Sequence, residues 1–102
     1  CLKATIDLMK ADFSKLKHHS DFNVGAMSFS AGELAASIKK YMPDFEIEYK
    51  PDFRQNIADS WPRAVDDSAA REEWGWKPSY DLDAMTQDML KNIKIKHEKG
   101  LI

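Results

Sequence analysis

The side chains best suited to bind a ligand are in one short stretch, RQNIADSWP, which runs from Arg54 to Pro62. Trp61 follows Ser60 directly, and Arg54 opens the stretch. An aromatic face, a hydroxyl and a guanidinium together suit a small polar ligand. Large aromatic residues more often pack in a core, so the residue types alone leave ligand contact and core packing open for Trp61.

The other reactive side chains form no catalytic set. The sequence contains neither a GxGxxG nor a GxxxxGK loop, and His18 and His19 are adjacent, with no third ligand at metal-binding spacing. Cys1 has no identifiable base. Asp66 and Asp67 could do acid–base work, but their place before a helix favours capping. We therefore predict no catalytic residue and no metal site in these residues.

Composition narrows the class of protein. A chain of 102 residues fits one domain, and its net charge of -2 provides no field that would gather nucleic acid. No apolar run is long enough for a membrane span, and no signal-peptide pattern opens the chain. A single cysteine fits a reducing compartment. We expect a cytoplasmic protein without nucleic-acid or membrane partners.

The elements that position the RQNIADSWP stretch follow from apolar spacing. Residues 22–29 are an apolar, strand-like run, and residues 45–49 alternate apolar and charged side chains as a half-buried strand does. Between them, Ser30 and Glu33 have the spacing of a capping box, and Pro43 ends the helix that they begin. Strand, helix and strand predict a βαβ unit with parallel strands, and hence an α/β fold.

Helices flank this unit in the prediction. The first helix has apolar residues at helical spacing from Leu2 to Phe13. A short helix begins near Asp66 and ends at Gly75, and the last helix is capped by Asp81. Trp74 and Trp76 are interpreted as lids on the core. Residues 51–65 are predicted to be an irregular segment, of the length that binding loops have.

Two sets of motifs resemble a known family. The pattern D-x-S-x-A-x-x-x-x-G-W-x-P, which ends at Pro78, resembles the C-terminal region of extended short-chain dehydrogenases and nucleotide-sugar epimerases. AMSFSAGELAASIKKYMPDFEI, RQNIADSWP and WGWK together resemble the short-chain type of L-threonine 3-dehydrogenase. The resemblance runs from Leu2 to about Leu90. It implies that residues 1–102 are one C-terminal substrate-binding portion of a Rossmann-type parent about three times longer, with the Rossmann domain absent from this chain.

The resemblance also implies a reaction for the parent. It is hydride transfer from C3 of L-threonine to NAD, which gives 2-amino-3-oxobutanoate and NADH. Trp61 is then expected to line the substrate pocket, with Ser60 beside it. Arg54 could hold a carboxylate through two parallel hydrogen bonds, and an ion pair with a nearby aspartate is the equal alternative. The parent is expected to be a homodimer.

This chain departs from the family in two motifs. The glycine-rich dinucleotide loop is missing, and so is the Tyr-x-x-x-Lys pair, since Tyr41 is followed four residues later by Phe45. We therefore expect the chain alone to bind no cofactor and to be inactive. Two alternatives stay open: the corresponding portion of an NAD-dependent nucleotide-sugar epimerase or dehydratase, and a free-standing, non-catalytic α/β module.

Overall fold

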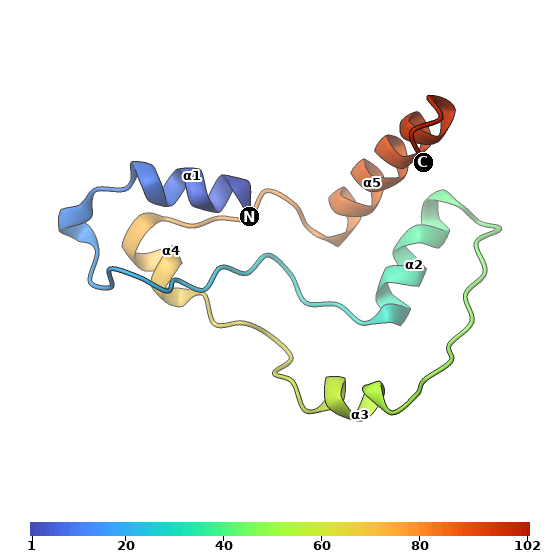
Figure 1. Ribbon diagram of the computed structural model, residues 1–102, viewed down its shortest axis with the longest axis horizontal. Coiled ribbons are helices and arrows are strands. Elements are labelled where there is room, and N and C mark those ends of the chain that lie inside the picture. Colours follow the sequence, from blue (N-terminus) through green and yellow to red (C-terminus); the bar gives the residue numbers. More distant parts are fainter. The chain divides into compact units, whose positions relative to one another are not determined.

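The computed structural model describes residues 1–102 and contains helices joined by irregular segments, with no strand. Figure 1 accordingly draws coiled ribbons and no arrows. The elements in chain order are α1 (Leu2–Lys10), the 3-10 helix η1 (Phe13–Lys15), α2 (Ala31–Tyr41), α3 (Arg54–Asp59), α4 (Ser68–Trp74) and α5 (Leu82–Glu98). None of these helices is both long and apolar enough to cross a membrane.

The chain divides into two compact units. Unit 1 contains Cys1–Ala26 and Pro62–Ser79, and unit 2 contains Met27–Trp61 and Tyr80–Ile102. Each unit is therefore built from two stretches that are distant in sequence.

The predicted α/β fold is wrong, because neither residues 22–29 nor residues 45–49 form a strand. A strand needs backbone N–H and C=O groups of a neighbouring strand as partners. No backbone hydrogen bond joins the two runs, and the bond from Phe45 N to Met42 O closes only a turn. The first run is also split between the units after Ala26. Alternating apolar residues show which side chains share a face, but they do not supply a partner.

Two helix starts predicted from capping residues are confirmed. Ser30 Oγ accepts from the backbone N–H of Glu33 at 3.2 Å, and Glu33 Oε2 accepts from Ser30 N at 2.6 Å, so the capping box of α2 is confirmed. Asp81 caps α5 through a 2.8 Å bond from Ala84 N. These local patterns are confirmed because each one satisfies backbone donors that a helix start leaves free.

Helix α3 was missed, since residues 51–65 were predicted to be irregular. Its start is supported by Asp52, whose Oδ1 accepts from Arg54 N at 3.0 Å. The helix has no buried residue, so it lacks the apolar stripe on which the prediction depended.

In unit 1, two side chains hold the backbone of Gly25. Asp67 Oδ2 accepts from Gly25 N at 3.2 Å, and Trp76 Nε1 donates to Gly25 O at 2.8 Å. A Cβ added at Gly25 would lie 3.4 Å from that aspartate oxygen, which is an ordinary van der Waals contact. Asp66 and Asp67 are both predicted as caps of α4. Asp67 occupies the N-cap position but its side chain makes no capping hydrogen bond, whereas Asp66, one residue earlier, accepts from Ser68 N at 3.0 Å. The core of the unit consists of Ala4, Ala70 and Trp76, with Phe22, Val24 and Trp74 packed against it.

In unit 2, α2 packs against α5 through small side chains. Ser37 Oγ donates to Thr86 Oγ1 at 2.9 Å, and this hydroxyl donates in turn to the Leu82 carbonyl at 2.8 Å. Ser37 and Thr86 are both buried, as is Ala35. Each buried hydroxyl therefore has a partner, and the short side chains allow the two helices to approach closely.

We predict that Trp76→Phe lowers the free energy of unfolding by about 1–3 kcal/mol, because the Gly25 carbonyl loses its donor in a part-buried place. Urea unfolding of the chain measures this. The matched control is Trp61→Phe, whose side chain is 68% exposed and which should change stability by less than about 0.5 kcal/mol. Equal effects of the two substitutions would contradict the role given to the Gly25 contact.

Candidate functional site

The sequence-predicted site residues lie together on one exposed segment of unit 2. Arg54 is the first residue of α3, and Ser60 and Trp61 directly follow the helix. All three residues are exposed, and the indole of Trp61 is 68% exposed and absent from the core of either unit. The structure thus gives Trp61 no core-packing role.

Arg54 is held by its neighbour Asp52. The guanidinium Nη2 lies 2.6 Å from Asp52 Oδ2, and Nε lies 3.0 Å from each carboxylate oxygen. The pair raises the pKa of Arg54 and lowers that of Asp52 through these side-chain hydrogen bonds. The ion-pair alternative for Arg54 is therefore what the structure shows. A guanidinium has five N–H donors, so Nη1 stays available for a second anion.

Ser60 uses its hydroxyl locally, because Oγ donates to the Ile57 carbonyl at 2.6 Å. Gln55 Nε2 likewise donates within the segment, to Asp59 Oδ1 at 2.7 Å. The hydrogen bonds of the Arg54–Trp61 segment therefore join residues within the segment or reach its immediate neighbours Asp52 and Phe53. It presents its side chains outward without a second wall from unit 2.

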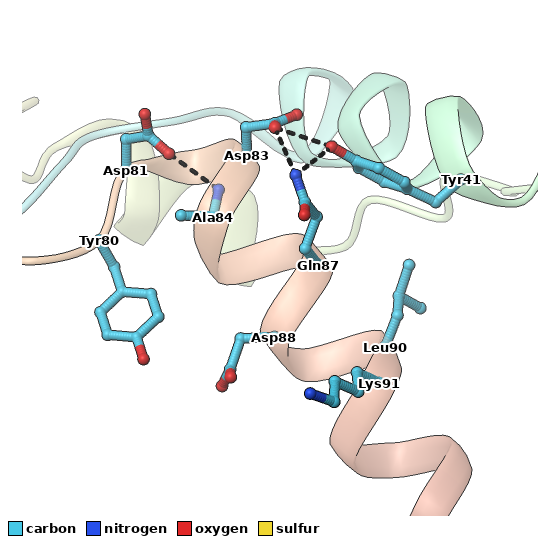
Figure 2. A pocket seen from close by; sticks show the side chains of 9 residues that line it. All are labelled: Tyr41, Tyr80, Asp81, Asp83, Ala84, Gln87, Asp88, Leu90 and Lys91. Carbon is cyan, nitrogen blue, oxygen red and sulfur yellow. Dashed lines mark hydrogen bonds between the residues drawn. The ribbon is translucent and has the colours of Figure 1, made fainter.

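A hollow of about 680 Å³ lies elsewhere in unit 2, where α2 meets α5. Figure 2 shows three of its side chains joined by hydrogen bonds, with the ring of Tyr80 lying apart from them. Tyr41 Oη donates to Asp83 Oδ2 at 2.7 Å, and Gln87 Nε2 donates both to Tyr41 Oη at 2.7 Å and to Asp83 Oδ2 at 3.0 Å. Lys40 Nζ lies 3.4 Å from the other Asp83 oxygen. Sequence reasoning missed this cluster because Tyr41 is 42 positions from Asp83 and 46 positions from Gln87 in the sequence.

The Tyr41 cluster is unsuited to proton abstraction. The hydrogen bond to Asp83 raises the pKa of the Tyr41 phenol above its ordinary value, and burial acts in the same direction against a lowering by Gln87. The bond from Tyr41 and the bond from Gln87 lower the pKa of Asp83. A neutral phenol and an ionised carboxylate match each other as donor and acceptor, so the cluster fastens α2 to α5.

The two adjacent histidines have different partners. His18 Nδ1 lies 2.6 Å from Glu73 Oε2, whereas the ring of His19 stacks on Phe13 with centroids 4.7 Å apart. Glu73 also accepts from the backbone N–H groups of Lys17 and His18. Burial raises the pKa of Glu73, but these hydrogen bonds together outweigh it and leave the pKa below its ordinary value. Glu73 thus anchors the connector that follows α1.

Comparisons with known proteins give consistent matches, although no family model matches the chain. The chain is 46% identical over 98 residues to an uncharacterized epimerase/dehydratase of Staphylococcus haemolyticus, covering 95% of this chain and 31% of that protein. It is 47% identical over 91 residues to the mitochondrial L-threonine 3-dehydrogenase of Sus scrofa, covering 88% of this chain and 24% of that protein.

Two solved structures also match. The L-threonine dehydrogenase of Clostridium difficile is 55% identical with a TM-score of 0.87, over 93% of this chain and 30% of that one. The enzyme of Phytophthora infestans is 49% identical with a TM-score of 0.87, over 94% of this chain and 31% of that one. The chain therefore spans roughly a quarter to a third of the length of the relatives that it matches.

We predict that the Tyr41 phenol titrates above about pH 10 and that Asp83→Ala returns its pKa toward the ordinary value. A folded-state pKa above the unfolded value means that the contact stabilises the protein fully below about pH 10 and is lost as the pH rises through the folded pKa. Ultraviolet titration of tyrosinate, assigned with Tyr41→Phe, measures this. Asp88→Ala, in the same hollow but outside the cluster, should leave the Tyr41 titration unchanged.

Proposed function

We propose that this chain, a homologue of part of the L-threonine 3-dehydrogenases and of the epimerase/dehydratases, is the C-terminal substrate-side portion of an NAD-dependent L-threonine 3-dehydrogenase. The parent converts L-threonine and NAD to 2-amino-3-oxobutanoate and NADH. The observation that carries the proposal is the 55% identity and the TM-score of 0.87 to the Clostridium difficile L-threonine dehydrogenase over 93% of this chain.

In this proposal, cofactor binding and substrate binding belong to different parts of the parent. NAD, when bound, accepts the hydride, and the remainder of the parent holds it, because residues 1–102 contain no glycine-rich dinucleotide loop. Residues 1–102 also lack the Tyr-x-x-x-Lys pair, so the acid/base group comes from that remainder as well. This portion is then inactive by itself and serves to bind and orient the substrate.

Trp61, Ser60 and Arg54 are the substrate-binding residues of this proposal. Arg54 begins α3 and Ser60 and Trp61 directly follow that helix, so all three are on one exposed segment, where Trp61 offers an apolar face and Ser60 a hydroxyl oxygen. Arg54 offers Nη1 to the threonine carboxylate while Asp52 holds Nε and Nη2. The segment has no second wall in unit 2, so the remainder of the parent completes the pocket.

A second candidate follows from the Staphylococcus relatives, which are described as epimerase/dehydratases and are 44% to 46% identical to this chain. In a nucleotide-sugar enzyme, Arg54 would hold a phosphate instead of a carboxylate. Two solved structures at 55% and 49% identity favour threonine, because both are L-threonine dehydrogenases. A free-standing, non-catalytic module has no such relative in its support.

Two further expectations belong to the parent. It is proposed to be a homodimer, although one similar structure, at 46% identity, is a monomeric L-threonine 3-dehydrogenase. A cytoplasmic location is proposed from the single cysteine, whereas the Sus scrofa relative is mitochondrial.

The function is tested by a grafted enzyme, in which residues 1–102 replace the matching part of the Clostridium difficile dehydrogenase. We expect the grafted enzyme to form NADH with L-threonine, because the substrate-side residues come from this chain and the cofactor site from the other. Absorbance of NADH measures the rate. A folded graft that binds NAD but shows no turnover of L-threonine, and that instead binds a nucleotide sugar, would favour the epimerase candidate.

In the grafted enzyme, we predict that Trp61→Ala lowers kcat/KM for L-threonine about tenfold or more, since a pocket loses a large apolar contact. Ile57→Ala is the matched control, because Ile57 is exposed on the same segment and has no assigned role. Steady-state kinetics with varied L-threonine measure both. Unchanged kinetics for Trp61→Ala would remove Trp61 from the pocket, and unchanged kinetics for Arg54→Lys would do the same for Arg54.

A further inference from the structure

Helix α1 has apolar side chains on two opposite faces. Ala4 and Leu8 are on the inner face, which packs in unit 1: Ala4 belongs to the core, and Leu8 lines a small hollow with Trp74. Each residue of an α-helix is rotated by about 100° from the one before it. This rotation places Leu2, Ile6 and Met9 together on the opposite side of the helix from Ala4 and Leu8. We call this second set, together with Phe13 just beyond the helix, the outer stripe.

The outer stripe is exposed along its whole length. Leu2 is 82% exposed, Ile6 49%, Met9 81% and Phe13 67%. The stripe itself contains no charged side chain. The charges of α1 are on a third face, where Lys3 Nζ lies 2.6 Å from Asp7 Oδ2. Such a stripe matches the centre of a permanent interface, from which charged residues are depleted.

Unit 1 has no residues of its own to cover this stripe. Its buried core is limited to Ala4, Ala70 and Trp76, and no large side chain of the chain is fully buried. A contiguous apolar patch of this kind on a folded protein indicates a contact surface.

The other large apolar surface of the chain is different in character. It is a groove of about 630 Å³ in unit 2, formed by α5 and the end of α2, with Ile93 in its lining. Lys91, Lys94 and His97 share that lining. Three basic side chains thus line that groove, whereas the outer stripe contains no charged side chain.

We propose that the outer stripe is the surface on which the remainder of the parent chain packs, through an apolar face of that remainder. The inference rests on the proposed function. The relatives are about three times longer than the matched region, so most of their polypeptide lies outside it. An uncharged stripe fits a face that stays covered within one folded chain better than one that opens and closes between molecules.

The test introduces a charge into the stripe of the grafted enzyme. Met9→Lys should lower its melting temperature by about 5 °C or more, because a lysine would be buried without a partner. In the 102-residue chain alone, the same substitution should leave thermal unfolding unchanged, since Met9 is 81% exposed there. Met9→Leu keeps the apolar contact and should preserve the melting temperature in both. Ile93→Lys, on the other apolar surface, is the matched control and should be tolerated.

Each contrary result has a definite meaning. If Met9→Lys leaves the melting temperature of the grafted enzyme unchanged, or if it destabilises the isolated chain equally, the stripe is not the packing surface. If it abolishes dimers of the isolated chain in sedimentation and leaves the grafted enzyme unaffected, a second copy is the occupant and the proposal fails. A graft that does not fold also counts against it. Formation of NADH by the unsubstituted graft tests the proposed function separately, so the two failures are distinguishable.

Discussion

Unit 1 depends on the two hydrogen bonds that hold the backbone of Gly25. They reach 42 positions along the chain to Asp67 and 51 positions to Trp76, and so connect the first quarter of the sequence to the segment around α4. The core that they accompany is thin, because its buried members are two alanines and one tryptophan. In such a unit, the directional bonds decide where the aromatic side chains lie, and the left-handed Gly75 (φ 70°) lets the chain turn directly from α4 into Trp76.

In unit 2, small side chains and hydroxyl hydrogen bonds hold the two longest helices together. Ser37 and Thr86 let α2 and α5 approach, and the Tyr41–Asp83–Gln87 hydrogen bonds close one side of that contact. The Arg54–Trp61 segment is exposed, and its hydrogen bonds stay within the segment or reach its neighbours Asp52 and Phe53. This exposure fits the proposal that the segment is one wall of a site whose second wall comes from the remainder of the parent.

The functional reading combines these physical limits with homology. Residues 1–102 contain neither a glycine-rich dinucleotide loop nor a Tyr-x-x-x-Lys pair, and the hydrogen bond to Asp83 raises the pKa of Tyr41. The similarity to L-threonine dehydrogenases underlies the proposed reaction, and the exposed Trp61, Ser60 and Arg54 are the residues proposed to orient an amino acid. The outer stripe on α1 is the surface proposed to pack against the remainder of the parent. The proposed roles of this portion are therefore substrate binding and packing against that remainder.

The sequence by itself determined the local features: the capping box at Ser30, the Asp81 cap and the glycine end of α4, because each involves atoms only a few residues apart. It also singled out Trp61 and Arg54 by residue type and resemblance. It could not reveal that residues 22–29 and 45–49 lack partners, that Asp67 binds Gly25 instead of capping α4, or that Tyr41 binds Asp83. Those outcomes depend on which distant segments meet in space, and only the tertiary structure decides that.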